Sequence, residues 1–421
     1  MTDMALMDRR ALLLASGGAA FGAFAASRAM AAEPPSTSEM MSARHFGAVG
    51  DGVTDDTAAL QAGLDAAFSK GGAMLTLPPG NYRITRTLRI ESPEGQGGVV
   101  GRHFGISGRG ARIVSAIADG SNVLQIASNS TQRFLLLDGL QINGTGREGH
   151  GLVLSCDGRG AYLYNACLRD IVIEGCGGDG CQMVGNVFES QIFNSYFRDN
   201  HGNGFTFAHG THGGILSAVH VFGCVFGQNG QHGAALERGC YDVSFNGCYF
   251  LLNAHYGLAA GNGCTLLNGC GFENNHTAAP GPDPANAGMR LVGFGTLIAS
   301  GAYSIANQMA LVDAVATGEL VMIGCRGFGD GKAKGAGLGR FSGTGGGRAT
   351  LIGCMGAIDR ANGFDPIELG GAEGGMRFGG AWNSHSLPQL GEYRLWVDGR
   401  GRLRLKKGAP AADDDGAVVG T

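Results

Sequence analysis

Four segments of this chain share one pattern: NSYFRDNHGNGF (Asn194–Phe205), GCVFGQNGQHGA (Gly223–Ala234), NGCYFLLNAHYGL (Asn246–Leu258) and NGCGFENNHTA (Asn268–Ala278). Each contains a phenylalanine, an asparagine three residues after it, and a cysteine or serine two residues before it. The phenylalanines are Phe197, Phe226, Phe250 and Phe272, and the asparagines are Asn200, Asn229, Asn253 and Asn275. Self-similarity at a spacing of about 20–50 residues is typical of stacked repeat architectures.

Short apolar runs between asparagine and glycine corners indicate the kind of repeat. In one unit these runs are Asp242–Phe245, Cys248–Phe250 and Gly257–Ala260. Asparagine and glycine tolerate the left-handed backbone angles of sharp corners. Three short strands per turn form a coil that buries its inward side chains only against its neighbours, so equivalent residues stack on each other. The repeats therefore predict an all-β, three-strand-per-coil parallel β-solenoid, in which the Phe and Asn positions are structural.

Composition agrees with this fold class and excludes others. The chain has 421 residues, of which 78 are glycine, and 16% are charged. Glycine at that level without a three-residue period excludes collagen and fits a turn-dense β protein. The net charge is −4 and there is no basic stripe, so a nucleic-acid partner is not expected.

The first 31 residues read as an export signal. Arg9 and Arg10 precede an apolar run from Ala11 to about Ala26, and Ala29–Ala31 offers a small-residue cleavage site. The paired arginines favour twin-arginine export, and an ordinary secretory signal is the alternative. We expect residues 32–42 to be a linker. The mature protein should be periplasmic or secreted, with no membrane association once the signal is removed.

The eleven cysteines predict a reduced core and no metal site. Cys224, Cys248 and Cys270 recur with the coil, and an IGC sequence brings in Cys325 and Cys354. Free cysteine packs well as a small apolar residue, so we expect an inward stack of thiols. None of the spacings forms a paired CxxC zinc site, acidic residues are too scattered to predict calcium, and no cofactor is expected.

The segment Ala43–Ile84 carries a family resemblance. FGAVGDGVTDDTAALQ, followed by LPPGNY, resembles the N-terminal signature of the pectate-lyase-like superfamily of right-handed parallel β-helices, which includes polygalacturonase-related proteins and phage tailspike-type depolymerases. Thr54 is expected to cap a helix whose apolar face is Leu60, Leu64, Ala67 and Phe68. The resemblance implies that this helix covers the N-terminal end of the solenoid. Asp51, Asp55 and Asp56 are accordingly interpreted as turn and cap residues.

The chain after the repeats ends in an expected tail. Residues 43–381 are assigned to the β-helix with its N-terminal cap, and residues 382–421 to a C-terminal capping tail. In this tail Tyr393–Val397 and Leu403–Lys406 flank an Asp-Gly turn, which predicts a β-hairpin. It resembles the tails of other β-helix and phage-tail-like proteins. A monomer or a homotrimer is expected.

One strand of each coil is the expected wall of a ligand groove. Strand alternation in GDGCQMV, GNGFTFA, QHGAALER and HYGLAAG sorts their residues onto two faces. The bulkier set should point inward: Cys181, Phe205, Ala234 and Leu258. The other set should floor a shallow outer groove: Gln182, Thr206, Ala235 and Ala259. In the resembling families this strand and the loop before it form the groove that holds a polysaccharide.

The loops around this strand carry the candidate site. One histidine per coil precedes the strand, and an acid and a guanidinium follow it. Imidazole titrates near neutrality and serves as acid or base. The predicted catalytic residues are His201, His232, Glu237 and Arg238. The predicted substrate-binding residues are Asp179, Gln182, Thr206, His209, His255, His276 and Arg290. A solvated turn role for these histidines remains the alternative.

These residues favour a lyase that cleaves an acidic, uronate-containing polysaccharide by β-elimination. Such a reaction needs a base and cationic help at the carboxylate. A glycoside hydrolase needs two carboxylates roughly 5–9.5 Å apart, for which Glu237 with Asp179, Asp199 or Glu273 is the alternative. Gly149–Leu152 (GHGL) resembles the GHG of polygalacturonases, yet its aspartate partners are missing from the sequence, so His150 is not included in the site.

A non-catalytic carbohydrate-binding or surface-structural β-helix also stays open, because fold alone does not imply activity. Aromatic platforms that stack on sugars would favour binding. The two tryptophans, Trp382 and Trp396, both lie outside the repeats.

Overall fold

The computed structural model describes most of the chain beyond residue 39. The described residues are 40–69, 73–92, 104–157, 160–261, 263–275, 287–293, 295–307, 310–316, 318–328, 338–341, 348–356, 358–359, 367–369, 376–378, 389–390, 392–408, 410–412 and 414–419. The expected signal at residues 1–31 and His276 lie outside them. Within the described residues, no helix is both long and apolar enough to cross a membrane.

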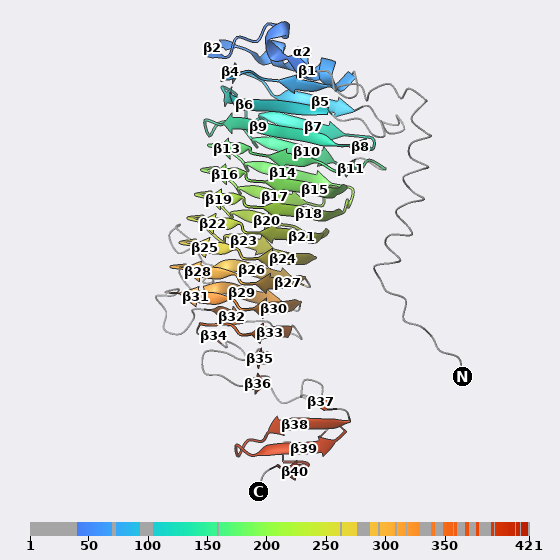
Figure 1. Ribbon diagram of the computed structural model, residues 1–421, viewed down its shortest axis with the longest axis vertical. Coiled ribbons are helices and arrows are strands. Elements are labelled where there is room, and N and C mark those ends of the chain that lie inside the picture. The colour runs from blue at the N-terminus through green and yellow to red at the C-terminus, as the bar shows by residue number, and fades with distance from the viewer. Residues whose placement is uncertain are drawn as a thin grey trace, which may run out of the picture. The chain divides into compact units, whose positions relative to one another are not determined.

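Successive coils stack their strands in parallel (Figure 1). One face of the stack is an eleven-stranded sheet: β5 (Leu88–Ser92), β7 (Leu124–Ser128), β10 (Leu152–Cys156), β14 (Cys181–Gly185), β17 (Phe205–Ala208), β20 (Ala234–Leu236), β23 (Leu258–Ala260), β26 (Ala287–Gly293), β29 (Ala310–Ala316), β32 (Gly339–Phe341) and β34 (Ile358–Asp359). Its strands pair in chain order, one per coil, so each coil adds one row of outward side chains to this sheet.

The other strands of the coils form a 25-stranded sheet. Its first half is β1 (Met40–Ser42), β2 (Asp51–Asp55), β3 (Met74–Thr76), β4 (Gly80–Ile84), β6 (Phe104–Ser115), β8 (Gln132–Arg133), β9 (Leu135–Asn143), β11 (Leu163–Tyr164), β12 (Cys167–Arg169), β13 (Val172–Glu174), β15 (Val187–Phe193) and β16 (Tyr196–Arg198). Strand β1 pairs with β3, so the last three residues of the expected linker are part of a strand.

The second half of the large sheet is β18 (Leu216–Phe222), β19 (Val225–Gly227), β21 (Cys240–Asn246), β22 (Tyr249–Leu251), β24 (Cys264–Asn268), β25 (Gly271–Glu273), β27 (Thr296–Ser300), β28 (Tyr303–Ile305), β30 (Glu319–Ile323), β31 (Arg326–Phe328), β33 (Arg348–Ile352), β35 (Ile367–Leu369) and β36 (Met376–Phe378). All of its pairs are parallel except β35 with β36. The strands predicted within the repeats are therefore present, with ends that differ by one or two residues.

A separate four-stranded antiparallel sheet lies near the C-terminus: β37 (Gln389–Leu390), β38 (Tyr393–Val397), β39 (Leu403–Lys407) and β40 (Ala417–Val418). Strands β38 and β39 are the predicted hairpin. Asp398, at the hairpin turn, accepts hydrogen bonds from the backbone amides of Arg400 and Arg402 and from the Arg404 side chain, so a buried carboxylate fixes the turn.

Stacked phenylalanines and asparagines hold the coils together, as the repeats predict. Phe197, Phe226, Phe250 and Phe272 are fully buried, and their neighbouring rings lie 5.4, 4.9 and 4.8 Å apart in nearly parallel planes. The asparagine side chains donate from one coil to the next at 2.8–3.1 Å, from Asn200 through to Asn307. Each of these amides also donates to a backbone carbonyl, so the buried corners keep their polar groups paired.

Helix α2 (Thr57–Ser69) packs on the first coil through the predicted apolar face, in which Leu60, Leu64 and Ala67 are buried. Its N-cap is Asp56 and not Thr54, because the Asp56 carbonyl accepts the first helical amide, that of Leu60. The Asp56 carboxylate accepts from Val49 and Gly50, and Asp55 accepts from Thr57. These aspartates therefore fix a turn and a helix start.

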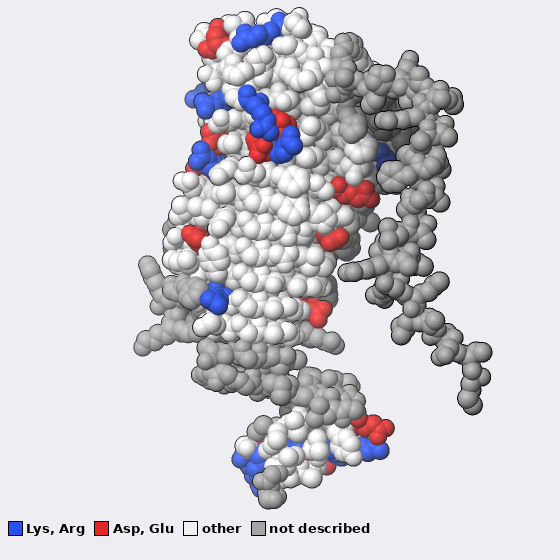
Figure 2. Space-filling view, viewed as in Figure 1, with Lys and Arg blue, Asp and Glu red and all other residues white. Residues whose placement is uncertain are grey.

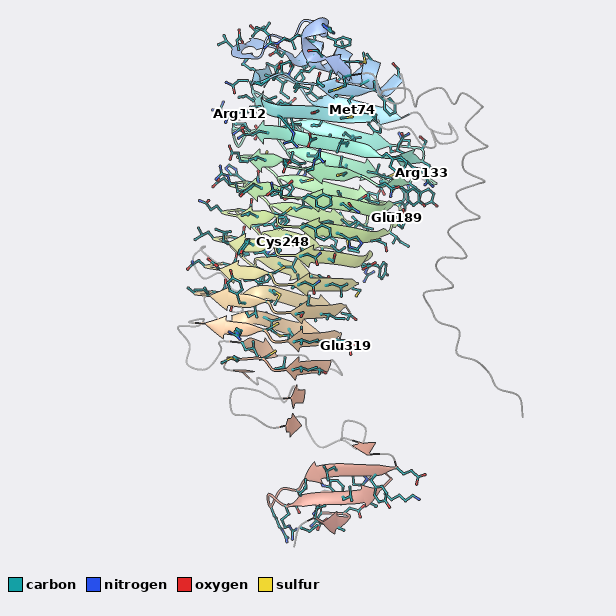
Figure 3. The ribbon with its side chains drawn as sticks, viewed as in Figure 1. Met74, Arg112, Arg133, Glu189, Cys248 and Glu319 are labelled. Carbon is teal, nitrogen blue, oxygen red and sulfur yellow. The ribbon has the colours of Figure 1, made fainter. Side chains whose placement is uncertain are left out.

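All eleven cysteines are free thiols. Cys224, Cys248 and Cys270 are fully buried and lie in one inward stack, as expected (Figure 3 labels Cys248).

Charged residues are unevenly placed on the outside. On the face that Figure 2 shows, Lys, Arg, Asp and Glu gather over the first coils, and the middle coils are nearly free of them.

Candidate active site

In five neighbouring strands of the eleven-stranded sheet, a glycine stands just before the strand, and the residues before these glycines fall in one column. The first residues of β10, β14, β17, β20 and β23 pair in register from coil to coil. Two residues earlier stand the five members of what we call the acceptor column: His150, Asp179, Asn203, His232 and Tyr256. The intervening glycines permit this spacing. A Cβ on Gly180, for instance, would lie 2.6 Å from the Gly204 carbonyl oxygen of the next coil.

The first four side chains of the acceptor column each accept the backbone amide of the next member. The amide of Asp179 donates to His150 Nδ1 at 2.9 Å, and that of Asn203 donates to Asp179 Oδ1 at 2.7 Å. The amide of His232 donates to Asn203 Oδ1 at 2.9 Å, and that of Tyr256 donates to His232 Nδ1 at 3.2 Å. Histidine, aspartate and asparagine share an acceptor atom at the same distance along the side chain, which explains why these types occupy the column.

This contact fixes the protonation of both imidazoles. A nitrogen that accepts an amide proton carries no proton itself, so neutral His150 and His232 hold their proton on Nε2. Burial lowers the pKa of His150, against the raising effect of Asp179. Burial, together with His255 and Arg290, lowers the pKa of His232 to about 4. Both rings are therefore neutral Nε2–H donors at pH 7.

Asp179 is a buried carboxylate with three hydrogen bonds. Besides the Asn203 amide at Oδ1, its Oδ2 accepts from Gln182 Nε2 at 2.8 Å and from Thr206 Oγ1 at 2.7 Å. Asn203 Nδ2 in turn donates to Thr206 Oγ1 at 3.0 Å. Oδ2 of Asp179 also lies 3.9 Å from Nδ1 of the neutral His150 imidazole.

A row of rings continues from His232 along the same edge of the sheet. The His232 ring lies 5.5 Å from the ring of Tyr256 and 5.7 Å from that of His255. The guanidinium carbon of Arg290 lies 5.2 Å from the centre of the Tyr256 ring. His255 and Arg290 are half-buried. Two imidazoles, a phenol and a cation are therefore close together along this edge of the sheet.

The structure divides the predicted catalytic residues into two groups. His201 and His232 precede β17 and β20, whereas Glu237 and Arg238 follow β20. Glu237 is five residues beyond His232 along nearly extended chain, a span of roughly 16 Å at about 3.3 Å per residue. His201, exposed, has its ring against Gly146, where a Cβ would lie 2.7 Å from its Cε1. His201 and His232 thus lie at one edge of the sheet, and Glu237 and Arg238 lie at the other.

The second group lies beyond the ends of the strands. His209 Nδ1 is 3.7 Å from Glu237 Oε2, and His212 Nδ1 is 3.7 Å from Asp157 Oδ1. Arg238 is exposed in the turn after β20. Of the predicted binding residues, Gln182 and Thr206 bind Asp179, and His255 and Arg290 lie near His232. Among the described residues, no group of three or more His, Cys, Asp or Glu side chains is placed to hold a metal ion.

The sequence reasoning missed His150, Asn203 and Tyr256. His150 was set aside because no aspartate partner is near it in the sequence, but Asp179 of the next coil supplies that partner. The sequence does contain a pattern that finds them. A polar or aromatic residue stands directly before a glycine in each of five fragments: GHGL, DGC, NGF, HGA and YGL. Alignment of the coils on that glycine brings the five residues of the acceptor column together.

Models of three protein families match successive parts of the chain. Residues 40–94 match "Rhamnogalacturonase A/epimerase, pectate lyase-like", residues 123–304 match "Right handed beta helix region", and residues 349–421 match "Capsule depolymerase". The chain is a right-handed parallel β-helix. These matches also support the resemblance to the pectate-lyase-like superfamily.

Similar proteins share this fold. The chain is 31% identical over 239 residues to mannuronan C5-epimerase AlgE5 of Azotobacter vinelandii, over 48% of this chain and 23% of that protein. It is 55% identical over 42 residues to alginate lyase 7 of the same organism, over 10% of this chain and 5% of that protein. The matched region thus spans about a quarter of the length of that epimerase. Among solved structures, ORF18 of Geobacillus virus E2 has a TM-score of 0.59 at 16% identity, over 96% of this chain and 72% of that one.

Proposed function

We propose that this β-helix acts on an acidic polysaccharide by removing the C5 proton of a uronate residue. The observation that carries the proposal is the neutral imidazole of His232, which accepts the Tyr256 amide at Nδ1, keeps its proton on Nε2 and lies beside the ring of His255. Proton removal next to a carboxylate places negative charge on its oxygens. Preorganised N–H donors at that carboxylate stabilise the charge in the transition state.

The proposed roles follow from the contacts. His232 donates to the sugar carboxylate through Nε2, and Arg290 supplies a positive charge one coil beyond Tyr256. His150, three coils away along the acceptor column, donates to another sugar of the same polymer. His255 takes the C5 proton, since its ring lies beside His232 and His232 itself has no unprotonated Nε2 to offer. Asp179 keeps the column ordered and favours protonated groups nearby. Glu237 and Arg238, at the other edge of the sheet, are assigned to binding of a neighbouring sugar.

The intermediate has two fates. Return of a proton to the opposite face of C5 gives epimerisation, whereas loss of the O4 substituent gives β-elimination and an unsaturated chain end. The expectation from sequence was elimination. The epimerase and lyase names of the similar proteins support a shared first step, C5 deprotonation, on a polyuronate.

A hydrolase is less well supported by this geometry. Its general acid must be a protonated carboxyl group. Asp179 accepts three hydrogen bonds, so both of its carboxylate oxygens are already engaged within the protein. Glu148, the other buried acid of this region, accepts amides of Thr145, Gly146 and Gly177 and has the pKa of a stabilised carboxylate, below its usual range.

The test is incubation of purified mature protein with polymannuronate in deuterated water. Deuterium at C5 without new chain ends means epimerisation, and ultraviolet absorbance of unsaturated uronate with new ends means elimination. New reducing ends with neither signal would mean hydrolysis and would contradict the proposal. Retention on a polyuronate column without any reaction would leave a binding β-helix.

We also propose that the protein is exported by means of residues 1–31, which would place the site where extracellular polysaccharide is. Cell fractionation and N-terminal sequencing of the mature chain test this. A product that begins near Ala32 supports it, and a cytoplasmic chain with an intact N-terminus contradicts it.

A further inference from the structure

Three aromatic rings and an arginine gather on the outside of the large sheet, away from the acceptor column. Arg133 of β8, Tyr164 of β11 and Phe188 of β15 are in register on successive coils. Their strand neighbours Gln132, Leu163 and Val187 are buried, so these three side chains point outward. Tyr162 lies just before β11. We call Arg133, Tyr162, Tyr164 and Phe188 the aromatic–arginine patch.

The rings of the patch contact one another and remain partly open to solvent. The Tyr164 and Phe188 rings lie 5.4 Å apart and nearly parallel, and Tyr162 lies 6.0 Å from Tyr164 and 6.1 Å from Phe188. Tyr162 is 36% exposed. The Arg133 guanidinium carbon is 4.8 Å from the centre of the Tyr164 ring, within cation–π range. The patch is therefore a preformed aromatic surface with a cation at one end.

Arg133 has no counter-charge in the part of the chain that the structure describes. Its buried Nε has no hydrogen-bond partner there, and no carboxylate pairs with it. Two other arginines of the same sheet differ: Arg109 and Arg169 both bind Asp138, at 3.0 and 2.8 Å. A guanidinium that packs on an aromatic ring and pairs with no carboxylate of the described residues has the chemistry that recognises a carboxylate through its terminal nitrogens.

We propose that the aromatic–arginine patch is a second binding site for an acidic polysaccharide, with a sugar ring against Tyr162 and a uronate carboxylate at Arg133. The identity of the ligand rests on the proposed function, because the same polymer would be the substrate at the eleven-stranded sheet. The chain reaches Tyr162 six residues after β10 ends, so the patch begins around the corner from that sheet. A long polymer that contacts both sites gains affinity through effective concentration, and a short oligomer does not.

The experiment compares the wild type with the double variant Arg133→Gln and Tyr162→Ala in the full mature chain. Retardation in gels that contain polymannuronate at low salt measures binding, with dextran as the neutral polymer. We expect the double variant to lose about tenfold in apparent affinity for polymannuronate. Its KM should rise for the polymer and stay unchanged for tetramannuronate, with kcat unaffected on both.

Matched controls are Arg112→Gln and Tyr196→Ala, an exposed arginine and a 42% exposed tyrosine of the same sheet. Figure 3 places Arg112 and Arg133 on opposite sides of the stack, with Glu189 on the side of Arg133. Glu189 is an exposed acid next to Phe188, so Glu189→Gln should strengthen binding of the polyanion two- to threefold at low salt, an order-of-magnitude expectation for about one screened charge.

Each outcome separates the patch from the proposed function. Turnover of polymannuronate with unchanged affinity and KM in the double variant would overturn the patch and leave the reaction standing. Arg133-dependent retention without turnover on any polyuronate would support the patch and contradict the reaction. Equal losses of affinity in the Arg112 and Tyr196 controls would show that binding is non-specific and would refute the proposal. A change of oligomeric mass in light scattering of the double variant would show that the patch is a contact between copies, and would also refute it.

Discussion

The backbone amide of Asp179 donates to His150 Nδ1 at 2.9 Å, across a gap of 29 residues in the sequence. That bond joins two neighbouring coils, and it decides which nitrogen of His150 carries the proton. The same bond recurs between Tyr256 and His232. One hydrogen bond therefore both pairs a backbone amide of the next coil and orients the imidazole. Substitutions can separate these two effects.

The first prediction separates them at His232. His232→Asn keeps an acceptor for the Tyr256 amide but has no Nε2–H, whereas His232→Ala leaves a half-buried amide unpaired. We expect His232→Asn to unfold within about 0.5 kcal/mol of the wild type and His232→Ala to lose about 1–3 kcal/mol. Both should lose about 10²–10³ in kcat if this donor stabilises the transition state. Urea unfolding and turnover of polymannuronate measure the two effects, and full activity of His232→Asn would contradict the assigned role.

The second prediction concerns Asp179. In Asp179→Asn the new amide group faces Gln182 Nε2, so two donors oppose each other where one bond was. The free energy of unfolding should fall by about 1–3 kcal/mol, and activity should fall with it. Asp199→Asn is the control, because Asp199 is exposed and its change should stay within about 0.5 kcal/mol. Equal stability of the two variants in urea would show that the Asp179 hydrogen bonds contribute little.

The third prediction is a pH dependence set by His232, whose pKa in the folded protein is about 4. In the unfolded chain a histidine has a pKa of about 6.5. As the pH falls from about 6.5 to about 4, the unfolded chain therefore binds a proton that the folded protein does not, and the free energy of unfolding declines. The unfolding midpoint in urea should follow this fall in the wild type and should flatten in His232→Asn. Parallel profiles for the two proteins would assign the dependence to other groups.

The fourth prediction tests the asparagine stack. Asn229 donates to Asn253 Oδ1 and to the Phe197 carbonyl, and it accepts from Asn200. Asn229→Ala leaves several of these buried groups without a partner and should cost about 3–5 kcal/mol. Asn268→Ala removes an exposed bond to Asn246 and should cost less than about 1 kcal/mol. Thermal and urea unfolding of both variants measure this difference, and equal costs would show that the buried stack contributes no special stability.

The fifth prediction concerns the thiols. Because all eleven cysteines are free, alkylation in denaturant without reductant should label eleven sites, and reductant should leave the melting temperature unchanged. In the native protein, labelling of Cys224, Cys248 and Cys270 should be slow, because their thiols are fully buried. A mass that corresponds to fewer than eleven labels after denaturation would reveal a disulfide.

Much of the fold was accessible from sequence because stacking repeats the same residue at the same place. Phe226 and Asn229 predict equivalent residues on the adjacent coils, where they stack. Strand alternation correctly assigned Phe205 to the core and Gln182 to the outside. The site was less accessible, because its members differ in type from coil to coil. His150 and Asp179 become neighbours only through the strand register, which loops of unequal length hide. The cap at Asp56 was misplaced by two residues, since Thr54 instead binds Asp51.

The acceptor column also bears on how such a protein changes over evolutionary time. Its first four members each accept the amide of the following coil, whether they are histidine, aspartate or asparagine. The loss or gain of one of these coils would therefore leave the amides between them with an acceptor. The order of chemical groups along the groove would change, and the architecture would not. A β-helix of this kind can therefore gain or lose functional side chains one whole coil at a time by recombination, without any new point substitution.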